Sequence, residues 1–378
     1  MTDSRQQQIV NEARAFAAAE ILPRAAEFDA REALPRDLIH QLAARGYLAA
    51  SFPEEYGGLG LDPVYYGLLT EEIGKGCSST RALLTVHTSM VGETLLRWGT
   101  PAQKSAWLPV MARGEKLAAF ALTEPDVGTD AKSVATSYQE AGDGFVLNGR
   151  KRWISFGDIA DVLLVVASHE GQITAFLVER ASAGVATRRM TGLLAGRAAH
   201  IAEVDLTDVF VPDTHVLGKV GNGFPYVVAT TLDHGRYSIA WAGVALAQAA
   251  VDAMVTYARQ RRQFGRKIHS FQLVQGMIAD AVTKTHAARA LCLRAGELRK
   301  AAHHDASIET SIAKYFASKV AMEVAIDAVQ VHGGNGCSNQ YPVERIFREA
   351  KILEIIEGTS QVQQEMIAGY GLRRYFRP

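Results

Sequence analysis

The feature of this sequence that most constrains its fold is a segment of short strands enclosed by two long helical segments. From about 119 to 222, strand-length apolar runs such as 162–166 and 173–178 follow one another without helical patterns between them. This spacing indicates a barrel or a sandwich, whereas alternating strands and helices would indicate a doubly wound sheet. At 378 residues, the chain is also too long for one ordinary core. We therefore expect an α+β multidomain fold with domains at 1–118, 119–222 and 223–378.

The flanking segments show helical periodicity. Residues 5 to about 118 place apolar side chains three and four positions apart, which predicts an N-terminal helical domain. After residue 223, long Ala-rich stretches at 239–257, 273–300 and 308–332 follow on short connections, which predicts a C-terminal four-helix bundle. Within the strand segment, Asn148-Gly149 lies between two short apolar runs and predicts a two-residue hairpin turn.

Composition excludes several classes of function. Lys plus Arg and Asp plus Glu both number 40, so the formal net charge is zero, which argues against a nucleic-acid partner. No uninterrupted apolar run approaches the roughly 20 residues of a membrane span, so we expect no membrane partner. The cysteines Cys77, Cys292 and Cys337 are widely spaced and odd in number. They predict a cytoplasmic protein without a disulfide framework.

Motifs for nicotinamide, ATP and zinc chemistry are absent. The sequence has no GxGxxG at a strand–helix junction, no P-loop and no HExxH. His303-His304 is the one candidate for a metal site, and it lacks carboxylate or cysteine partners at ligand spacing. We therefore expect no metal site.

Three motifs carry candidate chemistry. The first, 122–130, is a turn rich in hydroxyl and N–H groups, and it is either a phosphate or ring-edge site or an ordinary connector. The second, 330–336, has three glycines in four residues, which either cap a helix or admit a close backbone approach. The third, 351–361, places Glu357 after an apolar pair and before a glycine. That carboxylate is either exposed at a helix end or desolvated, with its pKa raised toward that of a general base.

In this order and across this layout, the motifs resemble the signatures of the acyl-CoA dehydrogenase family. The resemblance covers essentially the whole chain and implies an FAD-dependent acyl-thioester dehydrogenase, an oxidoreductase acting on CH–CH donors. The segments similar to the family patterns are Thr-Glu-Pro-x-x-Gly-Thr-Asp (123–130), Gln-x-x-Gly-Gly-x-Gly (330–336), Tyr-Pro-Val-Glu-Arg (341–345), Glu-Gly-Thr-Ser-Gln (357–361), 53–60 and 261–265.

The resemblance implies an FAD site between the strand domain and the bundle, completed by a neighbouring subunit. The residues implied within one chain are Leu122, Thr123, Gly128, Thr129, Trp153, Ile154, Ser155, Thr359 and Gln361. The residues implied from the neighbour are Arg261, Phe264, Gln272, Gln330, Gly333 and Gly334. The rigid guanidinium of Arg261 suits the pyrophosphate. A site shared in this way implies a homodimer or a homotetramer.

Glu357 matches the catalytic base of the family. Some branches carry the base on a helix instead, immediately before the arginine that matches Arg236, but that position is Gly235 here. Arg236 shares a helical face with Asp233 by its spacing. It either forms a local pair with Asp233 or lies at the active site, where it contacts the base region or a polar acyl group.

The resemblance also implies a mechanism. Glu357 would remove the α-proton of an acyl-CoA while the β-hydride passes to flavin N5, giving a trans-2-enoyl thioester. The thioester carbonyl would be polarised by the backbone N–H of the base residue and a ribityl hydroxyl of the flavin. Electron-transfer flavoprotein or another acceptor would reoxidise the cofactor.

Departures from the family pattern concern the substrate pocket, where we expect Trp241, Ile356 and Gly358. Ser155 replaces a common Thr, and Ile356 replaces a common Tyr. Trp241 stands where a small residue is commoner, and it either shortens the acyl cavity or packs in the core.

Segments around Cys77, Gly235 and Glu357 are similar to a branch that oxidises hydroxymalonyl groups on acyl carrier protein for polyketide extender units. In that alternative the thioester carrier is a protein and the acyl group is short and polar. Two further alternatives are a flavin oxidase or monooxygenase on the same fold, and a non-catalytic flavoprotein. The retained Glu357 argues against an oxidase.

Overall fold

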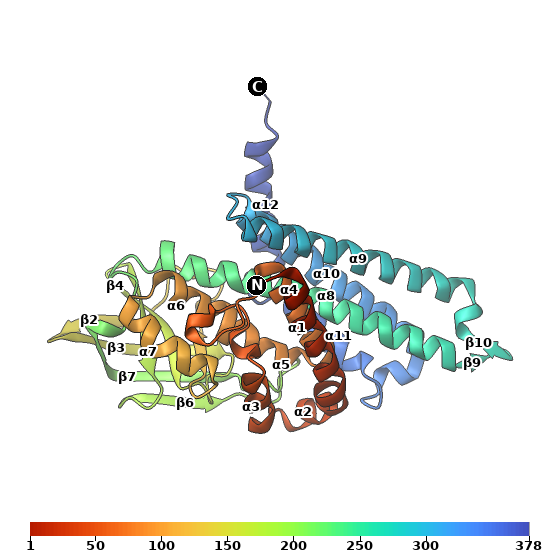
Figure 1. Cartoon of the computed structure of the whole chain (residues 1–378), viewed down its shortest axis with the longest axis horizontal. Coiled ribbons are helices and arrows are strands. Elements are labelled where there is room, and N and C mark those ends of the chain that lie inside the picture. Colours follow the sequence, from red (N-terminus) through yellow and green to blue (C-terminus); the bar gives the residue numbers. More distant parts are fainter. Residues whose placement is uncertain (378) are drawn as a thin grey trace.

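The computed structural model describes residues 1–377. Figure 1 shows the sheet at one end of the molecule, long helices running to the opposite end, and N-terminal helices packed between them. The helix α12 projects away from the body with the C-terminus. This arrangement agrees with the order of helix, strand and helix expected from the sequence.

The N-terminal part is helical because it repeats apolar side chains at helical spacing and has clear start signals. Asp62 caps α4 by accepting hydrogen bonds from two backbone N–H groups, and Pro63 begins the helix. Thr100 and Gln103 form a capping box at α7. The helices are α1 (Asp3–Phe16), α2 (Ala25–Arg31), α3 (Arg36–Ala44), α4 (Pro63–Gly76), α5 (Ser78–Leu83), α6 (Glu93–Trp98) and α7 (Pro101–Ala112).

The middle part is one eight-stranded sheet in the order β6-β7-β3-β2-β4-β5-β8, with β1 paired in parallel to β4. Most other pairings are antiparallel, and β4 and β5 are buried along most of their length. The strands are β1 (Ala118–Ala121), β2 (Ser137–Ala141), β3 (Gly144–Ile154), β4 (Val162–His169), β5 (Gln172–Glu179), β6 (Val185–Arg189), β7 (Ala202–Pro212) and β8 (Val216–Leu217).

The hairpin predicted at Asn148-Gly149 is wrong, because both residues lie inside the continuous strand β3. The Asn148 amide instead exchanges two hydrogen bonds with Asp208 on β7, at 2.8 and 3.0 Å, beside a register shift typical of a β-bulge. The two-residue turn lies earlier, where Ala141 pairs with Gly144 and Gly142 has a φ of 62°. Glycine favours such a turn because it adopts positive φ without steric penalty.

The C-terminal part is a bundle, as expected, and its helices extend beyond the predicted bounds. A two-stranded hairpin, β9 (Arg262–Gln263) and β10 (Arg266–Lys267), joins α8 to α9 at the tip of the bundle. Buried alanines let α8 and α10 approach closely. The helices are α8 (Ala229–Gln260), α9 (Gln272–Lys300), α10 (Ala306–His332), α11 (Val343–Leu353) and α12 (Ser360–Arg374).

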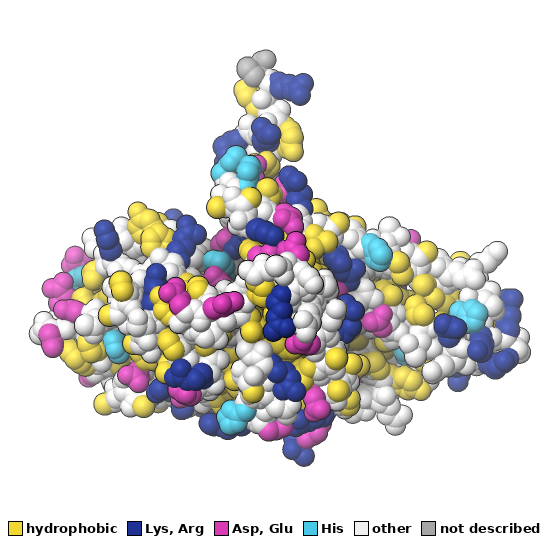
Figure 2. Space-filling model, viewed as in Figure 1, with side chains coloured by type: hydrophobic (Ala, Val, Ile, Leu, Met, Phe, Trp, Pro, Cys, Tyr) yellow, Lys and Arg dark blue, Asp and Glu magenta, His cyan; other side chains and the backbone are white. Residues whose placement is uncertain are grey.

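One helical stretch has the mean hydropathy of a membrane span, although it holds no uninterrupted apolar run of that length. The helical stretch 224–260 is long and apolar enough to cross a membrane by length and composition. Its most apolar window is 67% buried inside the protein, however, so this is a core helix. Figure 2 shows basic and acidic side chains interspersed over the visible face of the body, in keeping with the zero net charge.

Candidate active site

The residue matched to the catalytic base lies in an unusual turn between α11 and α12. Glu357 has a φ of 53° and Gly358 a φ of 85°, so two consecutive residues are left-handed. A non-glycine residue in this conformation is strained by about 1 kcal/mol or more and persists only when its surroundings hold it. The turn ends at Thr359, whose hydroxyl caps α12 by accepting the N–H of Val362 at 3.3 Å.

Two buried side chains hold this turn by its carbonyl groups. The ammonium of Lys314, on α10, donates to the Gly358 oxygen at 2.6 Å. The amide of Gln363 donates to the oxygens of Glu357 and Gly358, both at 3.2 Å. Both side chains are fully buried. The backbone of the base is therefore fixed from beneath by residues that belong to two different helices.

The sequence analysis missed Lys314 and Gln363. The signal for Lys314 was its place in a row of small residues on α10, where Thr310, Ala317 and Ala321 are all fully buried. These positions are four and three residues apart, which marks the inner face of a helix. A lysine on that face must be held by polar partners.

One carboxylate oxygen of Glu357 is buried, although the residue as a whole is half-buried. Its Oε2 atom is inaccessible and has no hydrogen-bond partner among residues 1–377. Burial raises the pKa of Glu357 from 4.5 to about 7, against the opposing attraction of Arg236 and Lys314. The carboxyl group can therefore accept a proton near neutral pH.

Gly235 on α8 explains how the carboxylate fits. A Cβ atom at this position would overlap Oε2 of Glu357, so a side chain there would displace the base. Some branches of the family supply their base from this position. Here the position is a glycine, and the Glu357 carboxylate packs against it.

Arg236 does not form the local pair with Asp233. Asp233 instead pairs with Arg299 at 2.7 Å, and Nε of Arg236 has no partner in the described part of the chain. Burial lowers the pKa of Arg236, while Glu357 and Asp233 oppose that effect. Arg236 also lies beside Gly358, since a Cβ there would come within 3.7 Å of Nε. A guanidinium next to the base is the alternative that the geometry supports.

The motif at 122–130 is anchored to β3 by a buried ion pair. Lys151 donates to the oxygen of Leu122 at 3.0 Å and to the carboxylate of Glu124 at 2.7 Å, and its side chain is fully buried. The N–H of Arg152 donates to the oxygen of Thr123 at 2.8 Å. Glu124 is therefore a structural residue of the motif, and Lys151 is its partner, which the sequence analysis missed.

Next to this anchor, the predicted flavin-side residues differ in exposure. Trp153 is 49% exposed and has a φ of 63°, whereas Ile154 is buried and Ser155 is half-buried. Gly128 and Thr129 are exposed, and a Cβ at Gly128 would meet no atom within 4 Å. Packing within the chain does not require glycine there, and an exposed indole suits a planar ring. These residues fit an FAD cofactor that approaches the protein backbone at Gly128, where a side chain would take up the space.

The residues predicted to act from a neighbouring subunit lie together at the tip of the bundle. Phe264, 93% exposed, and Gln330 line a cavity of about 310 Å³ with residues of α9 and α10. Arg261, Gln272, Gly333 and Gly334 are exposed at the same ends of α8, α9 and α10. Figure 2 shows basic side chains gathered at this tip.

The two groups of predicted residues are far apart in one chain. Arg236 and Arg261 are 25 positions apart on α8 and its C-cap, which corresponds to about 37 Å along the helix. Gln361 is exposed in the first turn of α12, near Glu357 in sequence. The structure thus places Arg261 and its neighbours away from the base.

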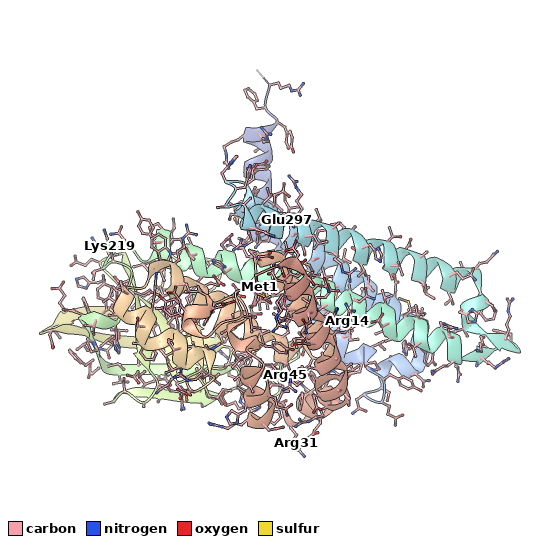
Figure 3. The ribbon with its side chains drawn as sticks, viewed as in Figure 1. Met1, Arg14, Arg31, Arg45, Lys219 and Glu297 are labelled. Atoms are coloured by element: carbon pink, nitrogen blue, oxygen red, sulfur yellow. The ribbon has the colours of Figure 1, made fainter. Side chains whose placement is uncertain are left out.

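Of the predicted pocket residues, Trp241 is fully buried and packs against Gly67 of α4, which fits the core alternative. Ile356 is half-buried against the bundle core. A larger cavity of about 480 Å³ lies between α1, α4, α8 and α11, and none of the predicted site residues lines it. Arg14, labelled on α1 in Figure 3, lines this cavity and pairs with Glu72 at 3.0 Å.

The statement that His303-His304 lacks a carboxylate partner was wrong. Asp305 follows directly, and the ligand atoms of all three residues lie within 4.8 Å of one another. Both histidines are exposed, in the turn between α9 and α10. Nothing else in the described residues points to a metal there.

Comparison with known proteins agrees with this geometry. Models of the N-terminal, middle and C-terminal domains of acyl-CoA dehydrogenase match residues 3–115, 119–209 and 221–371. The short-chain specific acyl-CoA dehydrogenase of Clostridium acetobutylicum is 37% identical over 372 residues, covering 97% of this chain and 98% of that protein.

Two solved structures extend the comparison. Butyryl-CoA dehydrogenase from Megasphaera elsdenii is 35% identical, with a TM-score of 0.94 over 99% of both chains. FkbI, for biosynthesis of the methoxymalonyl extender unit of the polyketide FK520, is 35% identical, with a TM-score of 0.89 over 95% of this chain and 99% of that one. The expected fold class and FAD cofactor are confirmed. The chain belongs to the acyl-CoA dehydrogenase family, and it is an FAD-dependent oxidoreductase that acts on CH–CH donors.

Proposed function

We propose that this enzyme oxidises the acyl group of an acyl-CoA, with Glu357 as the base that removes the α-proton. The observation that carries the proposal is the buried Oε2 of Glu357, which lies against Gly235 and has no partner among residues 1–377. A buried carboxylate whose pKa is about 7 can accept a proton at neutral pH and hold it away from water.

The backbone around the base suits polarisation of a thioester carbonyl. The N–H of Glu357 donates to no acceptor within the described residues. A fixed N–H beside the base can stabilise the negative charge that develops on the carbonyl oxygen as the α-proton leaves. Arg236 adds positive charge to the same region.

When bound, FAD supplies the acceptor for the β-hydrogen, which leaves as hydride. Leu122, Thr123 and Trp153 would hold the flavin end, since β3 fixes their backbone in one place. Arg261 and Phe264 lie too far along the bundle to join the same site in one chain. We therefore expect a second copy to supply them, in a homodimer or a homotetramer.

A second candidate substrate is a short polar acyl group on acyl carrier protein. Two observations favour it: the similarity to FkbI and the guanidinium of Arg236, which has no ion-pair partner in residues 1–377. A carboxylate or hydroxyl of the acyl group would give Arg236 a partner. We expect electron-transfer flavoprotein or another carrier to accept the electrons, and a cytoplasmic location.

Anaerobic bleaching of the flavin tests the proposal. Purified enzyme is mixed with acyl-CoA thioesters of different length and polarity, and with the same acyl groups on acyl carrier protein. Bleaching by CoA thioesters that is lost in Glu357→Gln supports the proposal. Bleaching by carrier-protein thioesters alone supports the second candidate. Rapid reoxidation of the reduced enzyme by air would point to an oxidase, and no bleaching by any thioester to a non-catalytic flavoprotein.

A further inference from the structure

We propose that Lys314 is a positioning residue that holds the left-handed Glu357–Gly358 turn and sets the electrostatic environment of the base. The inference rests on the proposed role of Glu357. It concerns a side chain on α10 that lies 44 positions before Gly358 and outside all of the motifs.

The burial of Lys314 calls for an explanation. Its side chain is fully buried, and no carboxylate lies within ion-pair distance of its ammonium in the described part of the chain. Removing an ammonium from water without an opposite charge is strongly unfavourable. Its hydrogen bond at 2.6 Å goes to a single carbonyl, that of Gly358, directly after the base. Such an arrangement weakens the fold and is typical of functional sites.

The geometry explains what this hydrogen bond does. Glu357 is strained at a φ of 53°, so its turn relaxes unless the following peptide is fixed. Lys314 fixes that peptide from α10, and Gln363 fixes it from α12 through weaker contacts of 3.2 Å. Loss of the Lys314 donor therefore frees the peptide on one side.

The charge of Lys314 acts on the base as well. The charged groups that act on Lys314 are Glu357, Arg236 on α8 and Glu354 at the end of α11. Lys314 and Arg236 together keep the pKa of Glu357 below the value that burial alone would give. Neutralising Lys314 removes one of these two cations, so the pKa of Glu357 rises and a larger fraction of the base is protonated at pH 7.

Three substitutions separate the two effects. Lys314→Met removes the donor and the charge, Lys314→Gln keeps a donor without charge, and Lys314→Arg keeps both. Lys319→Met is the matched control, because Lys319 is exposed on the same helix. Each holoenzyme is assayed for the rate of flavin reduction by a bleaching thioester between pH 5 and 9, and for hydrogen exchange of the amides at 357–362.

We expect Lys314→Met to lower the rate of flavin reduction at pH 7 by about fivefold, with half-saturation by the thioester nearly unchanged, as its acid limb moves up by about one pH unit from the pKa of about 7. Its amides at 357–362 exchange faster than those of the wild type. Lys314→Gln shifts the acid limb with slower exchange than Lys314→Met, and Lys314→Arg and Lys319→Met retain both wild-type properties. The proposal is wrong if Lys314→Met and Lys314→Gln leave the acid limb unmoved, or if Lys319→Met moves it equally.

The outcomes also separate this inference from the proposed function. If no thioester bleaches the wild type, the proposed function fails, and exchange at 357–362 still shows whether Lys314 holds the turn. If Lys314→Met does not fold, Lys314→Gln and Lys314→Arg decide the matter, because they share a donor and differ in charge.

Discussion

Replacing Glu357 with Gln should stabilise the folded protein at alkaline pH while it abolishes flavin reduction. The physical reason is that burial raises the pKa of this carboxyl from 4.5 to about 7. Below pH 4.5 the group is neutral in both folded and unfolded chains. Between pH 4.5 and about 7 the unfolded chain releases the proton while the folded chain keeps it. The wild type therefore loses stability as the pH rises through this range.

The magnitude follows from the change in pKa. One pKa unit corresponds to about 1.4 kcal/mol, so the move from 4.5 to about 7 destabilises the wild type by about 3 kcal/mol at pH 8. Gln has nearly the same shape and never ionises. The difference in unfolding free energy between Glu357→Gln and wild type should therefore grow by about 3 kcal/mol from pH 4.5 to pH 8 and then level off.

Urea unfolding followed by tryptophan fluorescence measures this difference at several pH values, with both proteins at equal concentration and equal flavin content. Glu365→Gln, an exposed change in α12, is the matched control and should give a difference that does not vary with pH. A pH-independent difference for Glu357→Gln would show that the carboxylate is solvated, and the assignment of a desolvated base would fall.

Three further predictions concern the supports of the site. Gly235→Ala should reduce the rate of flavin reduction by at least about tenfold in a folded enzyme, because its Cβ overlaps Oε2 of Glu357; equal stopped-flow rates would contradict this. Lys151→Met should destabilise the fold by about 3 kcal/mol, since it leaves the buried carboxylate of Glu124 without its partner at 2.7 Å. An unchanged urea midpoint would refute this prediction. Adding Glu124→Gln to Lys151→Met should recover part of the lost stability. Arg261→Gln should weaken FAD binding, because it removes a charged donor to the pyrophosphate. The melting temperature of the apoprotein should not change, because Arg261 is exposed at the bundle tip. Titration of apoprotein with FAD measures the affinity, and an affinity equal to that of the wild type would show that Arg261 is not part of the cofactor site.

The sequence could single out Glu357 as the proposed base because the signal is local. Glu357, Gly358 and Thr359 are consecutive, and a motif of adjacent residues is visible without any knowledge of packing. Gly235 was read correctly as a position without a base, although its contact with Oε2 could not be foreseen. Local patterns also misled, as at Asn148-Gly149, where β3 continues through both residues and Asn148 bonds across the sheet to Asp208.

The sequence by itself determined the order of helical and strand segments, the family motifs and the candidate for the base, because each depends on residues that are neighbours in the chain. Only the tertiary structure decided which distant side chains support that base. Lys314 reaches Gly358 across 44 positions, and Lys151 reaches Glu124 across 27. The sequence allowed Arg236 either to pair with Asp233 or to lie at the active site. The ion pair between Asp233 and Arg299 excludes the first alternative. The physical reason is that a buried charge is stable only where folding brings partners to it, and those partners come from elements far apart in the chain.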